Sequence, residues 1–178
     1  GVVLPKDNYL KELRQLTTEN NILLIFDEVM SGFRVALGGA QQIYKITPDL
    51  TCLGKVIGGG LPIGAFGGRK DIMENLSPLG GVYQAGTLSG NLTAVTCGIA
   101  TLKEVFKKGF YDKLSKKVKF LANEITKNNK NITINHLGSM FTIFFTNESV
   151  CDFQSAKKSD LNKFNNFFHE IYKRGLFF

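Results

Sequence analysis

The chain has 178 residues, of which 43% are hydrophobic, which is enough for a packed domain and too many for a disordered chain. No apolar run approaches the roughly 18 residues that a membrane-spanning helix needs. The net charge is +7, and the whole excess lies after residue 100, where lysines occupy the polar side of an amphipathic pattern. A solvated helix face explains this charge better than nucleic-acid binding, because arginines and aromatic residues are not interleaved there.

The three cysteines, Cys52, Cys97 and Cys151, are widely spaced and form no CxxC pair. The sequence therefore predicts neither a disulfide framework nor a metal site, and this usage is typical of a reducing compartment. The chain starts at Gly1 without an initiator Met or a signal peptide, and it stops within an apolar stretch. We expect it to be part of a longer protein.

The first seventy residues alternate helix and strand patterns. Apolar positions at helical spacing predict a helix over 7–20. The continuous apolar run at 22–26 predicts a strand buried on both faces, as in a parallel sheet. Further strands are predicted at 50–53 and 63–68, the second one rich in glycine. This order predicts an α/β fold.

The later part of the chain begins with a helix from about Ser89 to Lys107, whose small residues predict close packing against another element. A second, clearly amphipathic helix is predicted from Phe110.

Two strands and a last helix follow. The strands are predicted at 132–135 and 140–145, and the helix at 159–173 with Ser159 as its N-cap. We predict two domains, an α/β domain over 1–107 and a small α+β unit over 108–178.

Two charged positions follow predicted strands. Asp27 and Glu28 come at the carboxyl end of the first strand, where open α/β sheets bind ligands, although a helix or loop cap explains a carboxylate there equally well. Lys55 follows the second strand among apolar and glycine residues. Burial disfavours the charged form of a lysine, and a neutral amine is the nucleophile of Schiff-base chemistry. A surface lysine in a phosphate-binding glycine loop remains the alternative, without the spacing of a P-loop.

A third feature is the glycine-dense loop over 80–91, which opens a helix. Backbone amides at a helix start and the hydroxyl of Thr87 suit a phosphate group. An ordinary loop with Ser89 as a cap is the alternative.

Together these blocks resemble the class III pyridoxal-phosphate-dependent aminotransferases. The resemblance rests on DEVMSGFR over 27–34 and on TCLGKVIGGGLPIGAFGGR over 51–69. VALGGAQ over 35–41 and VYQAGTLSGN over 82–91 resemble an aminomutase branch of that family. The resemblance covers essentially the whole chain. The sequence departs from the family pattern at two positions, with Leu92 where Pro is usual and Thr142 where Gly is commoner.

The resemblance implies an α/β fold of fold type I, with part of the large-domain sheet followed by the start of a small α+β domain. By the same resemblance Lys55 is the Schiff-base lysine, Asp27 faces the pyridine nitrogen of pyridoxal 5'-phosphate, and Val29 packs on the ring face. Thr87 binds the cofactor phosphate, usually that of the neighbouring subunit, which implies a homodimer. Tyr83 is a weaker candidate for the substrate pocket.

The activity implied is the isomerisation of glutamate-1-semialdehyde to 5-aminolevulinate for tetrapyrrole synthesis, in the cytoplasm of a bacterium or in a plastid stroma. No nucleic-acid or membrane partner is expected. The alternatives are an aminotransferase with a separate amino donor, a basic binding module and an inactive fragment. Because the family carries an upstream half that grips the cofactor, we expect the chain alone to be inactive and poorly soluble.

Overall fold

The computed structural model describes residues 1–177 and divides into two compact units. We call residues 7–113 the sheet unit, and residues 1–6 together with those from 114 onward the hairpin unit. The domains predicted at 1–107 and 108–178 stay a prediction. No helix in the described part of the chain is long and apolar enough to cross a membrane.

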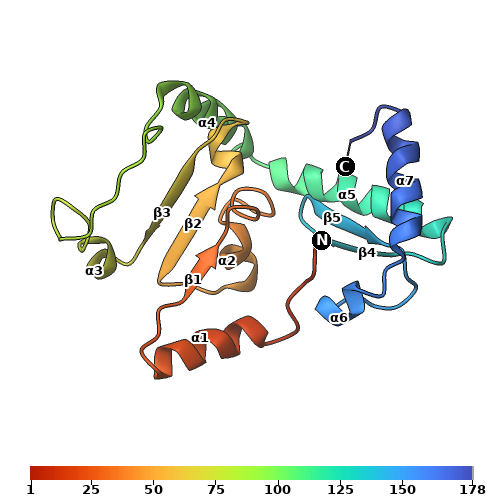
Figure 1. Cartoon of the computed structure of the whole chain (residues 1–178), viewed down its shortest axis with the longest axis horizontal. Coiled ribbons are helices and arrows are strands. Elements are labelled where there is room, and N and C mark those ends of the chain that lie inside the picture. Colours follow the sequence, from red (N-terminus) through yellow and green to blue (C-terminus); the bar gives the residue numbers. More distant parts are fainter. Residues whose placement is uncertain (178) are drawn as a thin grey trace. The chain divides into compact units, whose positions relative to one another are not determined.

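The sheet unit is built on three strands in the order β1-β2-β3 (Figure 1). They are β1 (Ile25–Asp27), β2 (Leu50–Gly54) and β3 (Gly64–Gly68). β1 pairs with β2 in parallel, and β3 returns antiparallel to β2. The strands predicted at 50–53 and 63–68 are confirmed. The carboxyl ends of β1 and β2 therefore lie at the same edge of the sheet.

Four helices and one 3-10 turn belong wholly to this unit among the described residues. They are α1 (Tyr9–Glu19), α2 (Gly39–Tyr44), η1 (Lys55–Gly58), α3 (Lys70–Met73) and α4 (Leu92–Val105). The sequence predicted α1 and α4, whereas α2 and α3 are too short to show a helical apolar pattern.

The first strand differs from its prediction. β1 is shorter than the run at 22–26 and lies at the edge of the sheet, with a neighbour on one side only. Ile22, Leu23 and Ile25 are 56%, 47% and 54% exposed, and only Leu24 of this run is buried. Burial on both faces is therefore wrong for the described chain. A run of apolar residues favours burial, but within residues 1–177 no helix or strand packs over these side chains.

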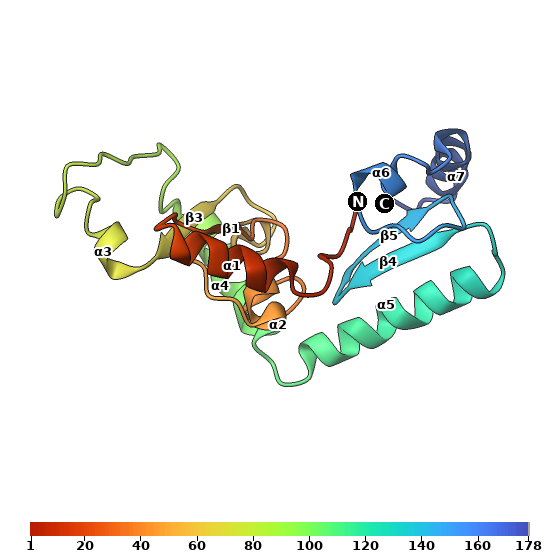
Figure 2. The same cartoon turned by 90° about the horizontal axis from the view of Figure 1, so that it is seen from below.

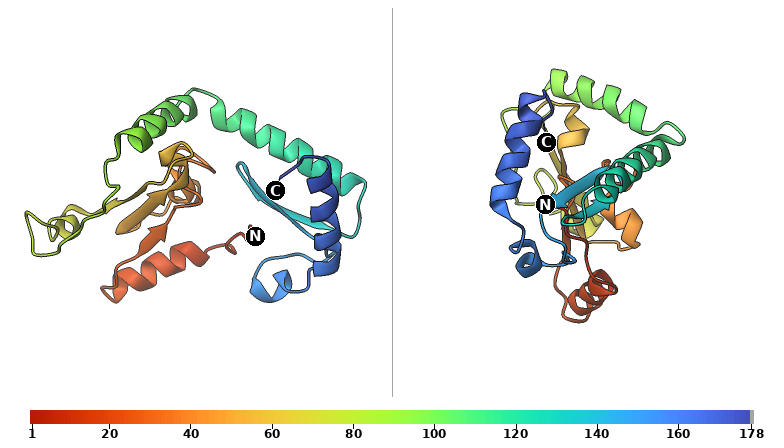
Figure 3. Two further views of the ribbon diagram at one scale, coloured as in Figure 1. Left: turned by 45° about the horizontal axis from the view of Figure 1, so that its top comes forward. Right: turned by 90° about the vertical axis from the view of Figure 1, so that its right-hand side faces the viewer.

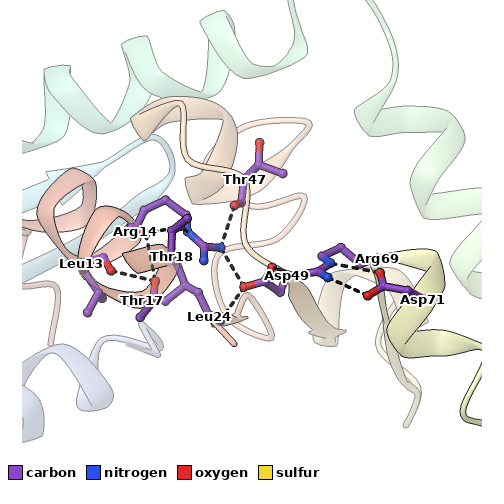
Figure 4. Close-up of polar contacts among 9 residues, drawn as sticks. All are labelled: Leu13, Arg14, Thr17, Thr18, Leu24, Thr47, Asp49, Arg69 and Asp71. Atoms are coloured by element: carbon purple, nitrogen blue, oxygen red, sulfur yellow. Dashed lines mark hydrogen bonds and ion pairs between the residues drawn. The ribbon is translucent and has the colours of Figure 1, made fainter. Parts of the chain in front are cut away.

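A buried carboxylate ties the start of β2 to the neighbouring elements (Figure 4). Asp49 Oδ2 accepts hydrogen bonds from the Leu24 N–H and from Arg14 Nη1 of α1, both at 2.8 Å. Its Oδ1 accepts from Nη1 of Arg69, which follows β3, at 2.9 Å, and Arg69 also pairs with Asp71. The Leu24 amide and the guanidinium groups of Arg69 and Arg14 hold the pKa of the Asp49 carboxyl well below its usual range.

The hairpin unit has a two-stranded antiparallel sheet between helices. Figure 2 shows β4 (Thr133–Leu137) and β5 (Met140–Phe144) with α5 (Phe110–Lys127) on one side and α6 (Phe153–Ala156) and α7 (Leu161–Lys173) on the other. Its buried apolar side chains are those of Val118, Ala122, Phe144 and Val150. The strands, α5 and α7 confirm the sequence pattern, and α5 begins within the sheet unit.

The cap predicted for the last helix is wrong. Asp160, not Ser159, is the N-cap of α7, and its carboxylate accepts from the amides of Asn162 and Lys163. The Ser159 hydroxyl instead accepts from the Phe145 N–H at 2.8 Å, which ties the end of β5 to the start of α7.

The first residues of the chain lie along the β4–β5 hairpin (Figure 3). The Val2 N–H donates to Thr142 Oγ1 at 2.8 Å, and Asn135 Nδ2 donates to the Val2 carbonyl at 3.0 Å. Thr142, one of the two departures from the resembled family, is therefore an anchor for this segment.

Candidate active site

Lys55 lies directly beyond the carboxyl end of β2, as the sequence predicted. It is the first residue of η1 and has a φ of 46°, in the left-handed region that non-glycine residues rarely adopt. Such a conformation costs on the order of 1–3 kcal/mol and persists where the surrounding structure enforces it. The side chain is exposed, so the burial expected for Lys55 is not found within this chain.

Close packing against α4 enforces the conformation of the lysine loop. A Cβ added at Gly98 of α4 would lie 2.1 Å from the Ile57 carbonyl oxygen. Gly59, with a φ of 59°, would place a Cβ 2.5 Å from the Cys97 carbonyl oxygen. These approaches confirm that the small residues of α4 pack closely, and they show that its partner is the loop that carries Lys55.

Asp27 stands at the end of the neighbouring strand. Its Cα partner across the parallel ladder is Cys52, three residues before Lys55. Asp27 is exposed, and its Oδ1 accepts from the Val29 N–H at 3.0 Å. Among residues 1–177 no lysine or arginine forms an ion pair with this carboxylate, which stands at the carboxyl end of β1, where open α/β sheets bind ligands.

Val29 and Lys55 line the same open cavity, which has a volume of about 800 Å³. Its other lining residues are Arg34, Val56, Gly59, Gly60, Leu61, Pro62, Ile63 and Thr101. Val29 also lies against the strand that leads to the lysine, because a Cβ added at Gly54 would come within 3.1 Å of Val29 Cγ1. An amine and an apolar side chain thus share one cavity, with a carboxylate at the adjacent strand end.

Thr87 and Tyr83 are not brought to this cavity. Both lie in the segment 81–93, in which every residue is exposed. A second cavity of about 1040 Å³ is lined by three of their neighbours, Gln84, Gly86 and Leu88, and by residues of β2 and β3. The alternative in which Ser89 caps this helix is wrong, because Asn91 caps α4 and accepts from the amides of Thr93 and Ala94.

The sequence left the role of Glu28 open between ligand binding and capping. Its carboxylate is only 1% exposed and accepts from the backbone amides of Ala40 and Gln41 at the start of α2. The alternative of a helix cap is therefore correct for Glu28, and the candidate ligand-binding carboxylate is Asp27 alone. The available signal was the Gly38-Gly39 pair, which marks a turn but not its partner.

Among residues 1–177 no group of three or more His, Cys, Asp and Glu side chains could hold a metal ion.

Comparison with known proteins places these residues in context. The sequence profile of the family described as Aminotransferase class-III matches residues 1–178. The chain is 52% identical over 181 residues to glutamate-1-semialdehyde 2,1-aminomutase of Natranaerobius thermophilus and 53% identical to the protein of that name from Citrifermentans bemidjiense. Each match covers 99% of the chain and 42% of the relative, so the chain spans less than half the length of these relatives.

Solved structures show the same fold. The β-phenylalanine aminotransferase of Variovorax paradoxus matches 99% of this chain and 42% of its own, with 28% identity and a TM-score of 0.90. A transaminase with pyridoxal phosphate bound matches 81% of this chain and 35% of its own, with 28% identity and a TM-score of 0.71. The α/β architecture predicted from the sequence is therefore that of fold type I.

Proposed function

The chain belongs to the class III aminotransferase family, and from this premise we propose that it is part of a pyridoxal-phosphate enzyme that isomerises glutamate-1-semialdehyde to 5-aminolevulinate. The observation that supports a cofactor site most strongly is the position of Lys55. It lies at the carboxyl end of β2, held in a strained conformation by α4, and it shares a cavity with Val29. The identity of about half the residues to named aminomutases supports the substrate.

The side chains present fit pyridoxal phosphate. An exposed amine, an apolar wall and a carboxylate at the adjacent strand end are the groups that such a cofactor needs for attachment, ring packing and contact with its ring nitrogen. When bound, the cofactor supplies an electron sink for the carbon that exchanges its proton.

Each side chain then has a defined part in the reaction. Lys55 supplies the amine that holds the cofactor and carries the proton to and from the reacting carbon. Asp27 would hold the proton on the ring nitrogen, because a nearby carboxylate favours the protonated, positively charged form of a nitrogen base. Val29 packs against the ring face and keeps water from it. Tyr83 does not reach this cavity within one chain, and its contribution to the substrate pocket rests on the resemblance to the family alone.

We propose a homodimer in which Thr87 binds the cofactor phosphate of the partner subunit. The support is the uninterrupted exposure of residues 81–93, which carry large apolar side chains such as Val82, Leu88 and Leu92. Mixing a Lys55→Ala variant with a Thr87→Ala variant tests this. If the two residues serve one site from different subunits, hybrid dimers keep one intact site and regain activity that neither variant has alone. Failure to regain activity after verified subunit exchange contradicts the shared site.

The proposed setting is tetrapyrrole biosynthesis in the cytoplasm, for which the cysteine usage described above and the aminomutase relatives are the support.

The second candidate is an aminotransferase that takes its amino group from a separate donor. It is favoured by the structural match to the β-phenylalanine aminotransferase. The two functions differ in stoichiometry. The natural protein that carries this chain should convert glutamate-1-semialdehyde to 5-aminolevulinate with no added amino donor. Dependence of turnover on an added donor amine would favour the aminotransferase.

A further inference from the structure

Glu28 carries a carboxylate that is almost wholly removed from solvent. Its Oε2 accepts from Ser31 Oγ at 2.6 Å and from the Ala40 N–H at 2.8 Å. Its Oε1 accepts from the Gln41 N–H at 2.8 Å and from Gln41 Nε2 at 3.3 Å. A buried charge is tolerated only where hydrogen bonds replace its hydration, and here four neutral donors do so without a lysine or arginine among the described residues.

The polypeptide around Glu28 is shaped to this carboxylate. Gly39 has a φ of 65°, and a Cβ added there would lie 2.4 Å from Glu28 Oε2. Only glycine therefore lets the start of α2 approach the carboxylate. Gln41 extends the contact into the sheet, since its Nε2 also donates to Thr51 Oγ1 of β2 at 3.2 Å.

The backbone of Glu28 is held as firmly as its side chain. Its N–H donates to the Cys52 carbonyl at 2.9 Å, which continues the ladder between β1 and β2, and its carbonyl accepts from the Gly32 N–H at 2.7 Å. β1 ends at Asp27 and the chain turns at Val29, so alternation sets Glu28 and Asp27 on opposite faces, while the hydrogen bond from the Val29 N–H to Asp27 Oδ1 joins the two neighbours of Glu28. A rotation of the backbone at Glu28 would therefore displace both Asp27 and Val29.

We propose that Glu28 is a positioning residue for the cofactor site, because its carboxylate clamps the segment that aims Asp27 and Val29 at the cofactor. The inference rests on the proposed function for the roles of Asp27 and Val29. The contact of Val29 with Gly54, next to Lys55, carries the same constraint to the lysine loop.

The first test needs no bound cofactor. In the natural protein without pyridoxal phosphate, Glu28→Gln replaces an acceptor oxygen by an amide donor that faces other donors. Hydrogen exchange at the Val29, Ala40 and Gln41 amides should become about 10-fold faster or more, as expected when a hydrogen bond to a charged acceptor is lost. Unchanged exchange at Val29 would overturn the proposal, because the clamp would then not reach the cofactor side.

The second test uses the enzyme loaded with pyridoxal phosphate. Glu28→Gln should weaken the visible circular dichroism of the bound cofactor, which reports how rigidly the ring is held. It should also lower kcat by about 10²-fold while KM changes much less, since a displacement of about 1 Å has that effect on turnover. Unchanged circular dichroism together with unchanged kcat would overturn the proposal.

Asp49→Asn is the matched control. Asp49 is also buried and its carboxylate also accepts a hydrogen bond from a backbone amide, that of Leu24, but it lies at the other end of β2. It should speed exchange at Leu24 and leave the cofactor signal in place. Equal loss of the cofactor signal in both variants would mean general destabilisation and would overturn the positioning role. If Glu28→Gln does not fold, Gln41→Ala removes only the side-chain contacts at 3.3 and 3.2 Å and should produce the same changes at smaller size. No change in that variant would likewise contradict the clamp.

Failure of the proposed function looks different. A wild-type protein that binds no pyridoxal phosphate, or makes no 5-aminolevulinate, contradicts the proposed function. A wild-type protein that does both, with a Glu28→Gln variant that behaves identically, contradicts only the role of Glu28.

Discussion

Replacing Asp49 by Asn should destabilise the sheet unit more than any change of an exposed charge. The Asp49 side chain is 8% exposed and contacts two guanidinium groups and the Leu24 amide. Breaking a buried ion pair by removing one partner costs about 3–5 kcal/mol. Asn keeps a weaker, uncharged acceptor for the Leu24 N–H, and Arg14 and Arg69 stay partly hydrated, so we expect a loss of about 2–3 kcal/mol in the free energy of unfolding.

Urea unfolding of the natural protein at several pH values measures this loss. The folded-state pKa of Asp49 is lowered, so its contribution is present in full above the unfolded pKa of about 3.9 and is lost as pH falls toward the folded value. The difference between wild type and Asp49→Asn should therefore be largest near neutral pH and shrink below about pH 4. Asp71→Asn is the control, since Asp71 also pairs with Arg69 but is exposed. A loss no larger than that of the control, or one that does not shrink on acidification, would refute the reasoning.

Three further results are expected. Gly98→Ala should destabilise the lysine loop and weaken cofactor binding despite the better helix propensity of Ala, because its Cβ would clash with the Ile57 carbonyl oxygen. The control Ile99→Ala, on the exposed side of α4, should leave cofactor binding unchanged. Equal cofactor dissociation constants for the two variants would argue against this packing. Asp27→Asn should still bind the cofactor but lose on the order of 10²-fold in kcat, and near-normal turnover would exclude its contact with the ring nitrogen. Residues 1–178 expressed alone should aggregate on size-exclusion chromatography and make no 5-aminolevulinate, because the apolar residues before β1 are exposed; a monodisperse active protein would contradict this.

Much of the fold follows from local patterns in the sequence. The four- and three-residue spacing of apolar positions in α5 and the small residues of α4 each specify one face of a helix. The structure buries Val118 of the first face and Ala94 and Gly98 of the second, whereas Leu121 and Ala100 of the same patterns are exposed. The placement of Lys55 after β2 was also predictable, because a short apolar strand followed by glycines leaves few other conformations.

Other features depend on hydrogen-bond and packing partners that are distant in the sequence, so a local pattern does not predict them. Ser89 and Ser159 each compete with a nearby residue that also caps well, and the helices begin at Asn91 and Asp160 instead. The partners of Glu28 lie 12 and 13 residues further along, in a helix too short to be recognised by periodicity. The exposure of the run before β1 depends on what covers the sheet edge, which the run itself does not encode.

Borohydride reduction of the natural protein with bound pyridoxal phosphate, followed by peptide mapping, tests the proposed site most directly. The reduced adduct should lie on Lys55 and should be lost in Lys55→Ala. Lys45→Ala is the matched control, because Lys45 is likewise exposed and has a left-handed φ of 56°, yet it does not line the cavity with Val29. The control should keep the adduct in full. An adduct on another lysine, or one that survives in Lys55→Ala, would contradict the assignment of Lys55 and the cofactor site built around it.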